Sequence, residues 1–318
     1  MAATSPKPAA SPAAPSPTAL LAACLAATWG IWGTSYLAIK WALVSLPPFF
    51  QMGTRFVAAA LLLGAWAAWR GARWPDAAQW RAAAVLGALM IGGGYGFTAL
   101  AQTSVASGLV VAFIAVVPAL VALGQWAYGE RPGRREALGI ALGLGGVLLL
   151  AGGDGFGASL AGLAAIVTAC ATWSLGSVWA RQGLPRALRA SALAPGAAGY
   201  ASQMLAGGVL LLGLSWAVGE QPRWPPDARS MASWAFLVVA STLLAFTAYM
   251  VLLERSSAAL ASSYSYVNPV IALALGVAID GEVVSGGEWL AAGVVLVGVV
   301  LLVAGASADE RARRRSRQ

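Results

Sequence analysis

The sequence predicts an all-α membrane protein with ten transmembrane helices in two inverted five-helix repeats. The first observation is composition: 59% of the residues are apolar and only 10% are charged, with a mean hydropathy of +0.74. A soluble domain carries about 25% charged residues. The second is an internal repeat, in which residues 104–152 are echoed by residues 256–305. The third is a set of long apolar stretches, five in each half.

Each apolar stretch is close to the roughly 17–25 residues that a helix needs to cross a hydrocarbon core of about 30 Å. The expected helices cover residues 18–40, 47–69, 80–101, 105–128, 135–152, 158–180, 198–219, 232–253, 257–279 and 287–305. Prolines among Ala and Ser make residues 1–17 a disordered cytoplasmic tail. The expected units are therefore this tail, a first repeat over 18–152, a second repeat over 158–305 and a basic cytoplasmic tail over 306–318.

Matching residues carry the repeat. Pro118 corresponds to Pro269, Glu130 corresponds to Glu282, and Ala171-Thr172-Trp173 repeats an earlier Ala-Thr-Trp that ends at Trp29. If each half holds an odd number of spans, the second half lies upside down relative to the first. Inverted repeats of this kind build binding sites that are reached from either side of a membrane.

The arginines predict the orientation, because Lys and Arg near helix ends stay on the cytoplasmic side. With a cytoplasmic N-terminus, the outer loops hold only Lys40, Arg223 and Arg229. Both termini are therefore expected in the cytoplasm. The net charge of +8 reflects this topology and the basic tail. The run from Arg311 to Arg317 favours contact with anionic lipid over nucleic acid.

Several chemistries lack the residues they require. The chain has no histidine, and neither Lys7 nor Lys40 stands in a phosphate-binding loop. The acidic residues fall in loops or at helix ends, so no carboxylate pair within a span could act as acid and base. Cys24 and Cys170 both fall within predicted helices, which argues against a disulfide. We therefore expect neither an enzyme nor a bound metal or cofactor.

Arg55 is the most deeply placed charge. It follows Pro47-Pro48 by about eight residues, or roughly 12 Å along a helix. A charge near the bilayer centre costs about 2.5–3.5 kcal/mol on insertion scales. Two interpretations remain open: Arg55 reaches the interface or main-chain carbonyls, or it faces a wet cavity and meets an anionic group of a substrate.

An aromatic stripe follows the first predicted helix. Trp29, Trp32, Tyr36 and Lys40 lie on one helical face. Such a stripe is typical of packing plus an interfacial belt. The indole N–H and phenol O–H groups would nevertheless lack partners in lipid, which favours an inward-facing stripe. Trp173 in the second half would then bring a matching ring to the same centre.

The paired prolines predict interrupted helices. Pro118 and Pro269 each remove a main-chain donor, as at the substrate sites of inverted-repeat proteins. Tyr264 and Asn268 lie beside the second proline on one face, where they either line a cavity or only pack. Tyr95 lies in a glycine run that permits bending or close approach. The candidate substrate-binding residues are Trp29, Trp32, Tyr36, Arg55, Tyr95, Trp173, Tyr264 and Asn268, with Pro118 and Pro269 as hinges.

Gly139 and Gly143 form a small-residue seam on the fifth predicted helix. A seam of this spacing permits close approach of a second helix. It indicates either packing within the chain or contact in a homodimer.

Three segments resemble the EamA family of the drug/metabolite transporter superfamily: TWGIWGTSYLAIKWALVSLPPFFQMGTRFVAAALLL, PALVALGQWAYGERPGRREALGIALGLGGVLLLAG and SYSYVNPVIALALGVAIDGEVVSGGEWLAAGVVLVG. The resemblance covers about residues 20–305. It implies a bacterial inner-membrane carrier with ten helices in two inverted repeats, generally an exporter of amino acids or other small metabolites. The positions that match the family's recurrent residues are Trp29, Trp32, Gly33, Arg55, Pro118, Glu130, Asn268, Pro269 and Glu282.

The sequence thus predicts a secondary transporter that works by alternating access on a small molecule such as an amino acid or metabolite. The alternative is a polytopic membrane protein that transports nothing, such as a lipid-modifying enzyme or an assembly subunit. The residues do not identify the substrate, the direction of transport or a coupling ion.

Overall fold

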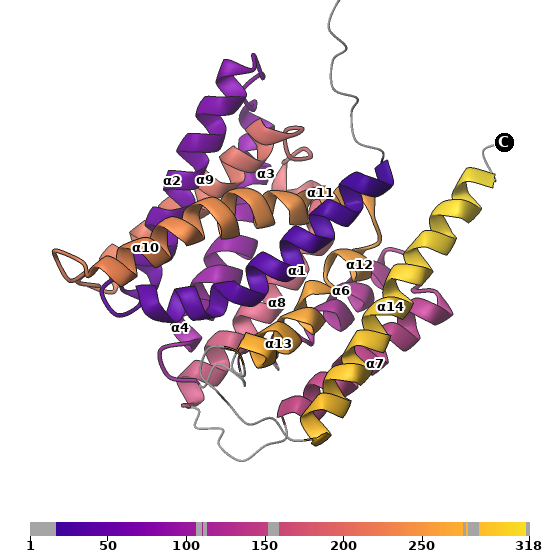
Figure 1. Cartoon of the computed structure of the whole chain (residues 1–318). Coiled ribbons are helices and arrows are strands. Elements are labelled where there is room, and N and C mark those ends of the chain that lie inside the picture. Colours follow the sequence, from indigo (N-terminus) through magenta and orange to yellow (C-terminus); the bar gives the residue numbers. More distant parts are fainter. Residues whose placement is uncertain are drawn as a thin grey trace, which may run out of the picture.

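The computed structural model is a helical bundle that describes residues 17–105, 110, 113–151, 159–275, 278 and 286–315 (Figure 1). The predicted tail up to residue 16, the junction between the repeats and Glu282 lie outside these residues. The helices are α1 (Pro17–Ala42), α2 (Pro48–Trp69), α3 (Ala77–Leu86), η1 (Gly87–Gly96), α4 (Phe97–Ala101), α6 (Val117–Ala127), α7 (Arg134–Ala151), α8 (Leu160–Gln182), η2 (Arg186–Leu188), α9 (Ala197–Ala217), α10 (Ala228–Phe236), η3 (Leu237–Phe246), α11 (Thr247–Arg255), α12 (Ala258–Ala261), α13 (Tyr264–Leu275) and α14 (Gly286–Arg315).

Six helices in the described ranges are long and apolar enough to cross a membrane. They are Thr18–Ala42, Pro48–Trp69, Ala77–Ala101, Leu160–Gln182, Ala197–Ala217 and Ala228–Arg255. Two shorter apolar helices, Val117–Ala127 and Trp289–Gly305, accompany them. The fold is therefore helical and rich in apolar spans, as the sequence predicts. The count of ten transmembrane helices stays a prediction.

Two of the long spans share an uncommon construction. In each, a short α-helix leads into a π-helical segment of 10 residues, η1 in one span and η3 in the other. The aspartates Asp76 and Asp227 cap the two spans by accepting hydrogen bonds from main-chain N–H groups of the first turn. Long π-helical segments are rare and often occur at functional sites. The two segments lie at corresponding places of the two halves.

The helices that carry the paired prolines are interrupted, but not in the same way. Pro118 lies at the start of α6, directly after a turn at residues 115–116. In the second half the turn is at Ser262–Ser263, and Pro269 lies inside α13. Ser265 Oγ donates to the main-chain oxygen of Ser262 at 2.8 Å, and such local bonds compete with the helical ladder. The break in the second half therefore precedes its proline.

Helices from the two halves interleave. α2 packs along α9, α8 packs on η1 and α6, and α1 packs on the α10–η3–α11 span and on α13. The first helix of each half thus contacts mainly helices of the other half. This arrangement surrounds one core, which holds the candidate site.

α7 and α14 lie side by side at the edge of the bundle (Figure 1). A Cβ added to Gly139 would lie 2.8 Å from the main-chain oxygen of Gly298, and one added to Gly143 would lie 2.7 Å from the Tyr266 ring. The predicted seam is therefore occupied within the chain, and a homodimer stays a prediction. α14 continues to Arg315, so most of the predicted basic tail is helical.

Candidate functional site

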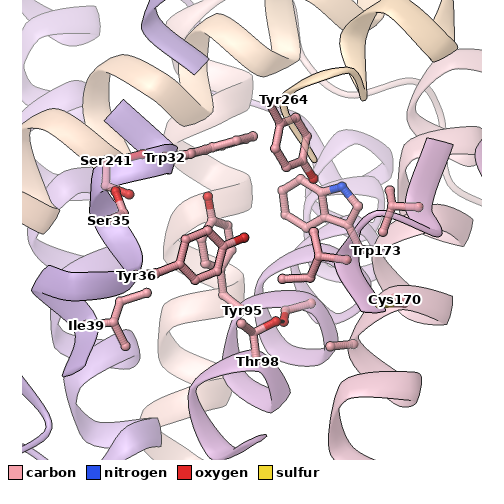
Figure 2. Close-up of a pocket in the computed structure, with 14 residues that line it drawn as sticks. Trp32, Ser35, Tyr36, Ile39, Tyr95, Thr98, Cys170, Trp173, Ser241 and Tyr264 are labelled. Atoms are coloured by element: carbon pink, nitrogen blue, oxygen red, sulfur yellow. Dashed lines mark hydrogen bonds between the residues drawn. The ribbon is translucent and has the colours of Figure 1, made fainter. Parts of the chain in front are cut away.

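A pocket lies at the centre of the bundle, between helices of both halves. Its volume is about 60 Å³. That is room for a few water molecules. It is lined by Trp32, Ser35, Tyr36, Ile39, Gly94, Tyr95, Thr98, Ile114, Val117, Ala169, Cys170, Trp173, Ser241 and Tyr264. Figure 2 shows side chains from α1, α4, α8 and α13 around the opening. Both π-helical segments contribute to the wall, η1 through Tyr95 and η3 through Ser241.

Aromatic rings form one side of this pocket. The Trp32 ring lies 4.5 Å from that of Tyr264, 5.4 Å from Tyr249 and 5.9 Å from Trp173, measured between centroids. Tyr95 lies 5.3 Å from Trp173 in an edge-to-face arrangement. Such arrangements place positive ring edges against negative ring faces. We call these five residues the aromatic cluster. Rings from α1, η1, α8, α11 and α13 therefore meet at one point.

Glycines bring η1 close enough to form the cluster. A Cβ on Gly93 would lie 2.3 Å from Thr172 Oγ1, and one on Gly94 would lie 2.7 Å from the Trp173 ring. Gly33 has the same effect on α1, where a Cβ would lie 2.8 Å from Ile271. Any larger residue at these positions would separate the helices. The glycine run thus provides the close approach that the sequence suggested.

Hydrogen bonds fix two of the rings. The Trp32 indole N–H donates to the main-chain oxygen of Ser241 at 3.1 Å, which ties α1 to η3. The Tyr249 hydroxyl is 2.8 Å from Ser177 Oγ, which links α11 to α8. Only the Trp32 bond joins the two halves, because Ser177 and Tyr249 both belong to the second half. The Trp32 ring is therefore held in place by a partner far away in sequence.

Arg55 is fully buried behind the pocket wall, between the two π-helical segments. Its Nε donates to Thr242 Oγ1 at 2.7 Å, and Nη2 is 3.5 Å from Ser241 Oγ. The guanidinium carbon lies 5.0 Å from the centroid of the Tyr95 ring. Nη1 has no hydrogen-bond partner. The side chain thus bonds to hydroxyl groups inside the bundle, and its contact with an anionic group of a substrate stays a prediction.

Other polar atoms near the centre also lack partners. They include the Trp173 indole N–H, the Tyr95 hydroxyl, both side-chain atoms of Asn268 and both of Gln51. Gln51 lies one turn before Arg55 on α2 and is also fully buried. Buried polar atoms normally find partners, so each unmet group needs an explanation. A water or a bound solute would supply one.

The predicted residues fall into three groups. Five of them line the pocket: Trp32, Tyr36, Tyr95, Trp173 and Tyr264. Arg55 contacts the wall from behind. Trp29 and Asn268 are not in the lining; the Trp29 indole donates to Ser263 Oγ at 3.0 Å, and Asn268 is buried in α13. Of the two hinge prolines, Pro118 follows the lining residue Val117 directly.

Sequence reasoning missed several residues of the site. Ser241 and Thr242, which hold Arg55, stand in an apolar stretch with no motif around them. Tyr249 belongs to the aromatic cluster and gave no separate signal. Gln51 could have been found, because a polar residue four positions before Arg55 shares its helical face.

A second polar cluster joins the helix ends near Glu130. Arg181 pairs with Glu130, with 3.3 Å between Nε and Oε2, and its Nη1 donates to the main-chain oxygens of Leu253 and Ser256. Arg181 thus connects the ends of α6, α8 and α11. Glu130, matched to the family by sequence, acts here as a structural acceptor.

The described part of the chain offers no metal site, since no three His, Cys, Asp or Glu residues gather there. None of the residues lining the central pocket is charged. The site therefore has the character of a binding pocket for an organic molecule, with aromatic faces and a few polar atoms.

The chain is similar to known membrane proteins along most of its length. The chain is 35% identical to the uncharacterized inner membrane transporter YedA of Escherichia coli (strain K12) over 283 residues, which cover 88% of this chain and 90% of that protein. It is 27% identical to the uncharacterized transporter sll0355 of Synechocystis sp. over 294 residues, covering 87% and 88%. A crystal structure of another protein, 22% identical, shares the fold with a TM-score of 0.73 over 93% of this chain and 100% of its own.

The family pattern matches the chain twice, over residues 17–152 and 160–304. These two matches cover most of the sequence, one in each half. The chain belongs to the EamA-like transporter family.

Proposed function

We propose that the protein is a secondary carrier of the bacterial inner membrane, which exports a small organic solute by alternating access through the central pocket. The observation that carries the proposal is the pocket itself. Residues of both halves form it in the middle of long apolar helices, and Arg55 behind its wall has an N–H group without a partner. Family membership supports transport, and it disfavours the alternative of a lipid-modifying enzyme or assembly subunit.

The proposed substrate carries an anionic group that reaches Arg55. A guanidinium only donates hydrogen bonds, and its remaining N–H groups suit a carboxylate. No carboxylate of the described residues pairs with Arg55. The residues proposed to contact substrate are the eight substrate-binding residues predicted from the sequence, together with Ser241 and Thr242. The family resemblance favours an amino acid or another small metabolite and favours export.

The proposed motion involves helices of both halves. α1 packs on η3 and α13, whereas α8 packs on η1 and α6, so each moving group would combine one helix of one half with partners from the other. Pro118 and the turn at Ser262–Ser263 interrupt two helices beside the pocket and would serve as hinges. The inverted topology, with both termini in the cytoplasm, rests on the arginine distribution and is part of this proposal.

Purified protein in liposomes tests the function. A carrier gives saturable counterflow: labelled solute enters vesicles preloaded with the same solute against its gradient. Trp173→Ala should reduce counterflow strongly, because the ring forms part of the pocket wall. Trp216→Ala is the matched control, since Trp216 is exposed on α9. Equal loss in both variants, or no counterflow with any solute of a broad metabolite panel, would contradict the proposal.

A further inference from the structure

Two hydrogen-bond donors at the central pocket lack acceptors, one in its wall and one directly behind it. The Trp173 indole N–H and Arg55 Nη1 are both buried, both unpartnered and both able only to donate. The Tyr95 ring lies between them, 5.3 Å from the Trp173 ring and 5.0 Å from the Arg55 guanidinium. The Tyr95 ring therefore separates the Trp173 ring from the Arg55 guanidinium. An acceptor group of a ligand would satisfy Arg55 Nη1.

Among the described residues, the same region has no charged acceptor. The acidic residues whose contacts are described lie at helix ends or in loops, where each has another role: Asp76 and Asp227 cap α3 and α10, Glu220 accepts from the start of α2, Glu130 pairs with Arg181, Glu136 accepts from Gly133, and Glu254 accepts from Tyr200. An ammonium group entering the pocket would thus meet no carboxylate of the described residues. It would also approach the fixed positive charge of Arg55.

An aromatic cluster alone would suit a cation, because ring faces attract positive charge. Here the Tyr95 face is already occupied by the Arg55 guanidinium. The remaining faces, on Trp32, Trp173 and Tyr264, are apolar surfaces against which a flat ring stacks well. Asn268 offers a neutral amide oxygen, but it does not line the pocket.

We infer that the substrate is a small organic anion with a flat apolar body and no ammonium group, that is, an aryl or heteroaryl carboxylate. This inference rests on the proposed function and narrows its substrate class. The flat body lies among Trp32, Trp173 and Tyr264, and the carboxylate accepts from Arg55 once Tyr95 moves aside. The pocket has a volume of only about 60 Å³. The rings of the aromatic cluster must therefore move apart when such a ligand binds. Amino-acid zwitterions and organic amines bind more weakly than the matching acid.

A series with one phenyl ring tests this inference by isothermal titration calorimetry on the purified protein in lipid nanodiscs at neutral pH. The probes are phenylacetate, phenylacetamide, phenylalanine and phenethylamine, which present an anion, a neutral amide, a zwitterion and a cation. Phenylacetate should bind about tenfold or more tightly than phenylalanine and phenethylamine, the effect of one hydrogen bond to a charged group. Phenylalanine or phenethylamine binding as tightly as phenylacetate, or no binding by any probe, would overturn the inference.

Arg55→Gln identifies the source of the preference. This variant should lose most of its affinity for phenylacetate while its affinity for phenylacetamide stays within about threefold, since the amide makes no ionic contact. Arg70→Gln is the matched control, because Arg70 ends the same helix, is exposed, and should leave all four affinities unchanged. If Arg55→Gln leaves the anion preference intact, Arg55 does not select the substrate and the inference fails.

Counterflow separates this inference from the proposed function. If liposomes with the protein exchange phenylalanine but neither bind nor exchange phenylacetate, the protein is a carrier and the inferred substrate class is wrong. If the protein binds phenylacetate with the expected selectivity but exchanges no solute, the inferred ligand class is correct and the proposed transport function is wrong.

Discussion

Arg55 on α2 donates from Nε to Thr242 Oγ1 on η3, at 2.7 Å and across the two halves of the chain. The bond holds a fully buried cation at a π-helical segment and leaves Nη1 without a partner. Holding a charge in this way costs desolvation free energy, which a purely structural role would not require. The proposed function accounts for this arrangement, because an anionic group of the substrate would accept from Nη1.

Replacing Arg55 should therefore affect transport more than folding. Arg55→Lys keeps the charge but loses the planar fork and should retain part of the activity. Arg55→Ala should lower the transport rate by about tenfold to a hundredfold, the range for hydrogen bonds to a charged group. Initial rates in liposomes measure this, with membrane insertion and the size-exclusion profile as controls. Near-normal transport by Arg55→Ala would assign the residue a structural role.

Asn268 should contribute to affinity to a smaller extent. It is fully buried on α13 and both polar atoms of its side chain lack partners. Asn268→Ala should raise the apparent KM about two- to twelvefold, the effect of one hydrogen bond. Gln203→Ala provides the comparison, since Gln203 is equally buried on α9 but its amide donates to Met90 Sδ, whereas Asn268 lies against the pocket-lining Tyr36. The prediction is wrong if both variants change KM by the same factor.

The sequence predicts the spans well because length and hydropathy determine them locally. The predicted spans 18–40, 47–69 and 198–219 correspond to α1, α2 and α9 within a few residues. The aromatic part of the site is also predictable, since a helical stripe places Trp32 and Tyr36 on one face.

The remainder of the site depends on features that the sequence does not reveal. A π-helical segment shifts the register of hydrogen bonds, so the inward face of η3 does not follow from a period of 3.6. Ser241 and Thr242 therefore gave no signal, although they hold Arg55. The break in the second half was expected at Pro269, whereas the turn at Ser262–Ser263 precedes it. Local hydrogen bonds of serine side chains decide that position.

Asp227 should make stability depend on pH. Hydrogen bonds from Ser230 and then Ser45 hold the pKa of the Asp227 carboxyl well below its usual range. A carboxyl whose pKa is lower in the folded state stabilises the protein above its unfolded pKa of about 4, and this stabilisation is lost as pH falls. The difference in Tm between wild type and Asp227→Asn should be largest near pH 7 and should become smaller as pH approaches 3. A difference that grows on acidification would contradict this assignment.

Reporter fusions test the inverted topology. Fusions after Arg135 and Arg255 should report the cytoplasm, and a fusion after Ser159 should report the outer side, because five spans would precede Ser159. The arginine distribution motivates this prediction. A cytoplasmic report from Ser159 would mean that the first half holds an even number of spans, and the inverted repeat would be refuted.

The most direct measurement uses a thiol that already lines the pocket. Cys170 lies in the pocket wall, and Cys24 is the only other cysteine of the chain. In a Cys24→Ser protein, a small membrane-impermeant methanethiosulfonate should react with Cys170 in both right-side-out and inside-out vesicles, at different rates. Added phenylacetate should slow both reactions. Reaction from one side only, at a rate that phenylacetate does not change, would contradict a central solute site that opens alternately to the two sides of the membrane.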